Sequence, residues 1–134
     1  MHTKIYREKD RVGAVVHTHS PYASTVATMG KPIPPIYYLI AFVGDEVPVA
    51  EYATYGTEEI GEAAVDALGD GNGVLLEKHG VLAVGGDLSQ AYQVASLIEE
   101  LARIYYQTLS AGVEPEPLAP EEIARLKGKF QSYG

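Results

Sequence analysis

The chain has 134 residues, of which 46% are hydrophobic and 21% charged, a composition that predicts one globular domain spanning residues 1–134. Ten Lys and Arg against 18 Asp and Glu give a formal net charge of −8, which argues against a nucleic-acid-binding surface. The sequence has no cysteine, so disulfides and thiolate metal sites are excluded, and His, Asp or Glu would hold any metal.

The sequence also offers no signal for a membrane location. No apolar stretch approaches the roughly 20 residues of a membrane-spanning helix, and residues 1–11 are too polar for a signal peptide. We therefore expect a cytoplasmic protein with no nucleic-acid partner and no membrane partner.

The N-terminal part of the chain predicts a helix, a strand and a second helix. Residues 1–11 have the character of the last turns of a helix. The β-branched run 12–16 predicts a strand that ends in a His-x-His sequence. The Ser20-Pro21 pair that follows is a helix start signal, and this helix would end at Gly30.

The middle of the chain is expected to add two strands and a helix. Residues 36–43, rich in Ile, Tyr and Phe, predict a strand. Residues 47–52 predict a short edge strand, because proline within strands is confined to edges. Thr57 is expected to cap a helix whose apolar positions run from Ile60 to Leu68.

The C-terminal half predicts a hairpin followed by two helices. Strands at 74–78 and 81–84 would be joined by a tight turn that contains His79. Residues 87–109 keep the helical spacing of apolar residues behind a capping-box-like start, and residues 120–130 predict a last helix. The sum is an α/β fold with a central, mostly antiparallel or mixed sheet flanked by helices.

Three of the four histidines stand where a predicted strand ends or turns. His17 and His19 lie two residues apart, so a strand would place both imidazoles on one face, and His79 falls at the hairpin turn. Three histidines with an open fourth position form the ligand set of a catalytic zinc site. The same spacing also fits a packed or solvated histidine pair, so spacing alone leaves two interpretations open.

Four segments carry patterns that occur together, in this order, in one known family. They are His17–Ala23, Ile33–Tyr38, Tyr52–Thr57 and Glu77–Gly85. On these segments the chain resembles the class II aldolase and adducin family over nearly its whole length, and the closing residues 129–134 are similar as well.

The resemblance implies that His17, His19 and His79 bind Zn²⁺ or another divalent metal, which stabilises the negative charge formed when a carbon–carbon bond breaks. It also implies catalytic roles for Tyr38, which would reach a neighbouring subunit's site in a homotetramer, and for Tyr133, which would close over the site. An ordinary strand aromatic and a frayed tail residue are the alternatives. The implied function is that of a lyase that cleaves a sugar phosphate such as L-fuculose 1-phosphate into dihydroxyacetone phosphate and an aldehyde.

The resemblance leaves out the family's N-terminal part, which carries a phosphate-binding loop and a glutamate base. Glu77 is the resident carboxylate that a strand would point toward the metal, although solvated strand glutamates are common. We interpret the chain as a fragment of a full aldolase or as a short form without aldol chemistry, and expect it to oligomerise or to be marginally stable. The alternative functions are a sugar-phosphate epimerase or dehydratase, and a non-catalytic, metal-binding adducin-like module.

Overall fold

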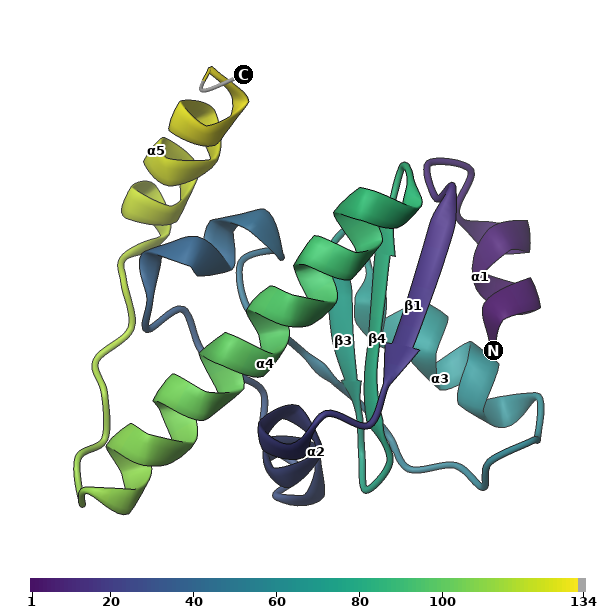
Figure 1. Cartoon of the computed structure of the whole chain (residues 1–134), viewed down its shortest axis with the longest axis horizontal. Coiled ribbons are helices and arrows are strands. Elements are labelled where there is room, and N and C mark those ends of the chain that lie inside the picture. Colours follow the sequence, from purple (N-terminus) through teal and green to yellow (C-terminus); the bar gives the residue numbers. More distant parts are fainter. Residues whose placement is uncertain (133–134) are drawn as a thin grey trace.

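The chain folds into a mixed sheet with helices on both faces, seen in a computed structural model that describes residues 1–132 (Figure 1). In chain order its elements are α1 (His2–Glu8), β1 (Ala14–Thr18), α2 (Pro21–Thr28), η1 (Tyr38–Phe42), β2 (Val49–Ala50), α3 (Glu59–Leu68), β3 (Gly73–Leu76), β4 (Gly80–Gly85), α4 (Leu88–Ser110) and α5 (Pro120–Gln131). The strand order is β1-β4-β3-β2. β4 is antiparallel to β1 and β3, whereas β2 is parallel to β3. The predicted α/β fold with a mixed, mostly antiparallel sheet is confirmed.

Two hydrophobic clusters lie on opposite faces of this sheet. α2 and α4 pack on one face, and α1 and α3 cover the other (Figure 1). Successive residues of β4 alternate between the clusters, with Val81 and Ala83 toward α4 and Leu82 and Val84 toward α3. Because both faces are covered, every residue of β3 and β4 is buried, which explains their continuous apolar sequence.

The ends of the helices follow the sequence signals, with one exception. Asp87 caps α4 by accepting the Gln90 N–H at 2.8 Å, and Gly112 follows the helix in a left-handed conformation with φ 78. The predicted cap at Thr57 is wrong, because Glu58 is the N-cap residue of α3 and the Thr57 hydroxyl donates to the Thr54 carbonyl at 2.7 Å. Within residues 1–132, no helix is both long enough and apolar enough to cross a membrane.

Residues 36–43 contain the 3₁₀ helix η1, so the predicted strand is wrong. The Ile40 N–H donates to the Tyr37 carbonyl at 3.0 Å, and the Val43 N–H donates to the Ile40 carbonyl at 2.8 Å. This three-residue spacing buries Ile40 and Val43 in the cluster that also holds α4 and α5 residues. A short apolar run does not by itself distinguish such burial from that of a strand.

The predicted last helix is present as α5, which lies beyond α4 and away from the sheet (Figure 1). Its Phe130 ring stacks on Phe42 with 4.0 Å between ring centroids. The Leu118 N–H donates to the Pro35 carbonyl at 2.8 Å and ties the proline-rich link to the segment before η1. α5 is therefore anchored to η1, and the two form one structural unit that packs into the cluster on the α4 side of the sheet.

Candidate metal centre

The pairing of β1 with β4 brings the three predicted ligands to one end of the sheet. His17 lies in β1, and His19 lies one residue beyond its end. His79 is the last residue of the turn before β4. Because the register pairs Thr18 with Val81, the end of β1 lies beside the start of β4. The sheet register thus joins two sequence segments that are far apart in the chain.

The turn between β3 and β4 directs His79 toward the other two histidines. Lys78 has a left-handed backbone with φ 55, which is uncommon for a residue other than glycine. The His79 N–H donates to the Leu76 carbonyl at 3.0 Å and closes the turn. Only glycine fits at position 80 without a shift of the backbone, because β1 lies so close that a Cβ there would overlap the Thr18 carbonyl oxygen. Local backbone strain is therefore concentrated next to a predicted ligand.

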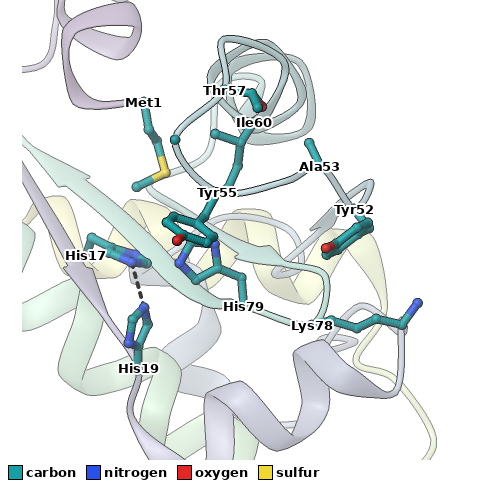
Figure 2. Close-up of a pocket in the computed structure, with 11 residues that line it drawn as sticks. Met1, His17, His19, Tyr52, Ala53, Tyr55, Thr57, Ile60, Lys78 and His79 are labelled. Atoms are coloured by element: carbon teal, nitrogen blue, oxygen red, sulfur yellow. Dashed lines mark hydrogen bonds between the residues drawn. The ribbon is translucent and has the colours of Figure 1, made fainter.

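The imidazoles of His17, His19 and His79 form one cluster (Figure 2). One ring nitrogen of each lies within 4.8 Å of the others. The ring centroids are 4.7 Å apart for His17 and His19, 4.9 Å for His17 and His79, and 5.0 Å for His19 and His79. This convergent set of three nitrogen donors could hold a metal ion and leave a further position open.

A backbone carbonyl fixes the orientation of the His17 ring. Nδ1 of His17 lies 2.8 Å from the Val81 carbonyl oxygen, which can only accept, so Nδ1 carries the proton. The lone pair of His17 then lies on Nε2, at 2.9 Å from Nε2 of His19 (Figure 2). A carbonyl partner of this kind orients a metal-binding histidine and selects its tautomer.

Burial lowers the pKa of two histidines of the cluster below the ordinary value of 6.5. For His17, burial outweighs the Val81 carbonyl, which raises the pKa, and the neighbouring histidines lower it further. For His79, burial is again the largest cause of the lowered pKa, followed by His19. Both imidazoles are thus neutral at neutral pH, the state in which a ring nitrogen can bind a metal.

A pocket of about 580 Å³ opens onto the histidine cluster (Figure 2). Its volume lies in the range of small-molecule binding sites. The pocket combines the ring nitrogens with walls that are largely apolar or aromatic. The wall residues are Met1, Tyr52, Ala53, Tyr55, Gly56, Thr57, Ile60 and Lys78.

Glu77 does not join the cluster. Its Oε1 lies 2.7 Å from the Lys78 ammonium, and its Oε2 accepts the Tyr52 N–H at 3.3 Å. The hydrogen bond from Lys78 lowers the pKa of the Glu77 carboxyl. β3 ends at Leu76 and Lys78 is left-handed, so strand alternation does not extend to His79. Within residues 1–132, no carboxylate shares the three-histidine group.

The two predicted catalytic tyrosines lie outside this pocket or outside the described residues. Tyr38 begins η1, is 46% exposed, and packs its ring near Tyr37 and Phe130. It does not line the histidine pocket of its own chain. Tyr133 lies outside residues 1–132.

None of the eight wall residues belongs to the predicted site, and Tyr55 and Ile60 are two of them. Tyr55 lies in the loop before α3, and Ile60 lies in α3, lines the pocket and is otherwise buried. Tyr55 belongs to the segment 52–57, one of the four segments that carry the family resemblance. Membership in that segment could have identified Tyr55 as a pocket residue. Nothing could have identified Ile60, because its position also fits the buried apolar face of a helix.

The family follows from comparison with known proteins. The family description "Class II Aldolase and Adducin N-terminal domain" matches residues 1–106 of the chain. The chain belongs to the class II aldolase and adducin family. The resemblance carried by the four sequence segments is thereby confirmed, and the histidine cluster is a feature of a class II aldolase-like fold.

Three relatives show how much of such a protein the chain covers. A 5-deoxy-D-ribulose 1-phosphate aldolase from Bacillus thuringiensis serovar kurstaki is 45% identical, over 100% of this chain and 62% of that protein. An L-fuculose phosphate aldolase from Escherichia coli (strain K12) is 38% identical, over 99% of this chain and 62% of that protein. A solved structure of an L-fuculose 1-phosphate aldolase has a TM-score of 0.93 at 38% identity, over 97% of this chain and 61% of that one. The chain therefore spans about three fifths of the length of these relatives.

Proposed function

We propose that His17, His19 and His79 bind one divalent metal, zinc, and that the chain is the metal-binding part of a class II aldolase. The observation that carries this proposal is the convergence of three ring nitrogens within 4.8 Å. The Val81 carbonyl supports it, because it leaves the His17 lone pair on the nitrogen that faces His19. Three nitrogen ligands and no sulfur suit zinc in a catalytic site.

The proposed reaction is the reversible cleavage of a ketose 1-phosphate into dihydroxyacetone phosphate and an aldehyde. When bound, the metal supplies a Lewis acid that stabilises the negative charge left on the dihydroxyacetone phosphate half. The chain's own contribution is to bring the three imidazoles together, to lower the pKa of His17 and His79 through burial, and to orient the His17 ring through the Val81 carbonyl. Its pocket excludes water from one side of the substrate through the apolar wall residues.

The pocket wall favours a substrate whose far end is apolar. Ala53, Tyr55 and Ile60 present methyl, ring and alkyl groups to the pocket. L-Fuculose 1-phosphate and 5-deoxyribulose 1-phosphate, the sugars in the names of two relatives, both end in a methyl group. We therefore propose a deoxyketose 1-phosphate as the substrate, with lactaldehyde or acetaldehyde as the released aldehyde.

Assembly into a cytoplasmic homotetramer is part of the same proposal. Tyr38 is half exposed on the η1 surface and does not line the pocket of its own chain, so it would act in a neighbouring subunit. A phenol is a chemically suitable proton donor to the aldehyde oxygen. Tyr133 is proposed to close over the site from the C-terminal segment.

Metal analysis and a cleavage assay test the proposal. Purified chain is analysed for bound metal, then supplied with Zn²⁺ and with 5-deoxyribulose 1-phosphate or L-fuculose 1-phosphate. Released dihydroxyacetone phosphate is detected by coupled NADH oxidation. We expect one zinc per chain and cleavage that chelator abolishes and zinc restores. A chain that binds no divalent metal would contradict the proposal.

A second candidate function is a metal-binding module without turnover. It is favoured by the hydrogen bonds of Glu77, because the proton-transfer step needs a base and no carboxylate shares the cluster within residues 1–132. Stoichiometric zinc without release of dihydroxyacetone phosphate from either sugar would support this candidate over the aldolase.

A further inference from the structure

Glu99, in the middle of α4, contacts the start of α2 directly after the predicted ligand His19. Its Oε1 accepts the Tyr22 N–H at 3.0 Å, and its Oε2 accepts the Ala23 N–H at 2.8 Å. Both hydrogen bonds are partly buried. Both oxygens of one carboxylate therefore accept hydrogen bonds from two successive backbone N–H groups of a helix that is distant in sequence.

This contact supplies a cap that the local sequence does not. The first N–H groups of a helix have no partner inside it, and an N-cap side chain usually accepts one of them. Pro21 at the first helical position has no N–H, and the Ser20 side chain makes no cap hydrogen bond in the described part of the chain. The carboxylate of Glu99 fills this role from another element, and its charge also suits the positive end of the helix dipole.

The three histidines differ in how their own surroundings hold them. His17 is fixed by the β1–β4 ladder and by the Val81 carbonyl. His79 is fixed by the turn in which its N–H donates to the Leu76 carbonyl. His19 is exposed and follows the end of β1, and its ring lies beside the other two histidines and Gly80.

The position of His19 is therefore set by the two elements between which it lies. One is the end of β1, at Thr18, and the other is the start of α2, at Pro21. Two residues separate His19 from Tyr22, whose N–H Glu99 binds. A movement of the α2 start would be transmitted to His19 over a very short stretch of chain.

We propose that Glu99 is a positioning residue for the metal centre, acting through the start of α2 on His19. This role rests on the proposed metal function of the three histidines. Groups that orient metal ligands typically contribute 10- to 100-fold to metal affinity, and Glu99 would act on the ligand with the fewest contacts of its own.

Glu99→Gln is the variant that tests this role. The glutamine side chain keeps the shape of glutamate but has a single acceptor oxygen, so one of the two N–H groups loses its partner. Glu100→Gln is the matched control, because it makes the same change of charge and shape at the adjacent position of α4. Zinc affinity is measured by competition with a chromophoric chelator. The absorption spectrum of the Co²⁺-substituted chain is recorded at saturation, because it reports the geometry of the ligands.

We expect about 10- to 100-fold weaker zinc binding in Glu99→Gln than in wild type, with a shifted Co²⁺ spectrum, and neither change in Glu100→Gln. Wild-type zinc affinity and an unchanged spectrum in Glu99→Gln would overturn the role of Glu99 while leaving the metal site intact. Failure of the wild-type chain to bind zinc would overturn the metal proposal and the role of Glu99 together. Circular dichroism of the metal-free variants verifies folding. Should Glu99→Gln not fold, Glu99→Asp replaces it, because the shorter side chain draws both oxygens back from the Tyr22 and Ala23 N–H groups. Wild-type affinity and an unchanged Co²⁺ spectrum there would equally refute the role.

Discussion

The histidine cluster and the η1–α5 unit are built in opposite ways. His17 is placed by the sheet, His79 by the turn that the sheet closes and His19 by the link from β1 to α2, and the ligand atoms converge within one chain. In the η1–α5 unit, the Phe42–Phe130 stack fixes the helices, but Tyr38 stays half exposed on the surface. All three proposed metal ligands thus come from one chain, whereas Tyr38, the proposed proton donor, lies outside the pocket of its own chain.

The largest effect should come from removing a ligand from the cluster. If the roughly 10–16 kcal/mol of a four-ligand zinc site is shared equally, one ligand contributes about 2.5–4 kcal/mol, so His79→Ala should weaken zinc binding by roughly 70- to 900-fold. Isothermal titration with a competing chelator measures this change. Tyr38→Phe should leave zinc affinity at the wild-type value while lowering cleavage activity. Equal loss of zinc affinity in both variants would contradict the separation of the two regions.

An intermediate effect is expected from glycine substitutions, one in each region. Gly80→Ala should destabilise the chain by about 1–3 kcal/mol and weaken zinc binding, because the new Cβ would overlap the Thr18 carbonyl and contact the His19 ring. Gly128→Ala in α5 meets no heavy atom within 4 Å and should stabilise by about 0.5–1 kcal/mol. Urea unfolding of the metal-free variants measures both. A Gly80→Ala variant with unchanged free energy of unfolding would show that β1 and β4 adjust freely at the site.

The smallest effect is a pH dependence of stability that belongs to the histidine cluster. Burial lowers the pKa of His17 and His79 in the folded chain below 6.5, so the unfolded chain binds protons first as the pH falls. Stability should therefore be fully present above about pH 6.5 and decline as the pH falls below it, until the histidines of the folded chain are protonated as well. Thermal unfolding of the metal-free chain across this range measures the decline. His17→Gln should flatten it, and an unchanged slope in that variant would assign the decline to other groups.

Much of the fold could be predicted because local sequence patterns mark where the elements begin and which residues they bury. The Ser20-Pro21 and Asp87 signals, and the apolar spacing of α4, lie within a few residues of the elements that they start or define. Residues 36–43 could not be assigned in this way, because their 3₁₀ spacing is selected by burial against α4 and α5. Long-range packing of this kind leaves no local pattern in the sequence.

The candidate site was only partly predictable, for a related reason. His17 and His19 are close in sequence, but their meeting with His79 depends on the β1–β4 register. The orientation of Glu77 was missed because strand alternation stops at the left-handed Lys78. The Glu99 cap could not be predicted either, because no sequence pattern near Glu99 indicates a contact with the start of α2.

The convergence of the three histidines has a consequence for a chain that has no cysteine. A metal held by His19 and His79 would tie together two segments that are far apart in the chain, as a disulfide does. Because the unfolded chain would release the ion, the stabilisation would come from binding to the folded chain and would grow with the ratio of free zinc to its dissociation constant. Unlike a disulfide, this crosslink would open and close with the free zinc concentration, so the same ion would set both the reactivity of the pocket and the lifetime of the fold.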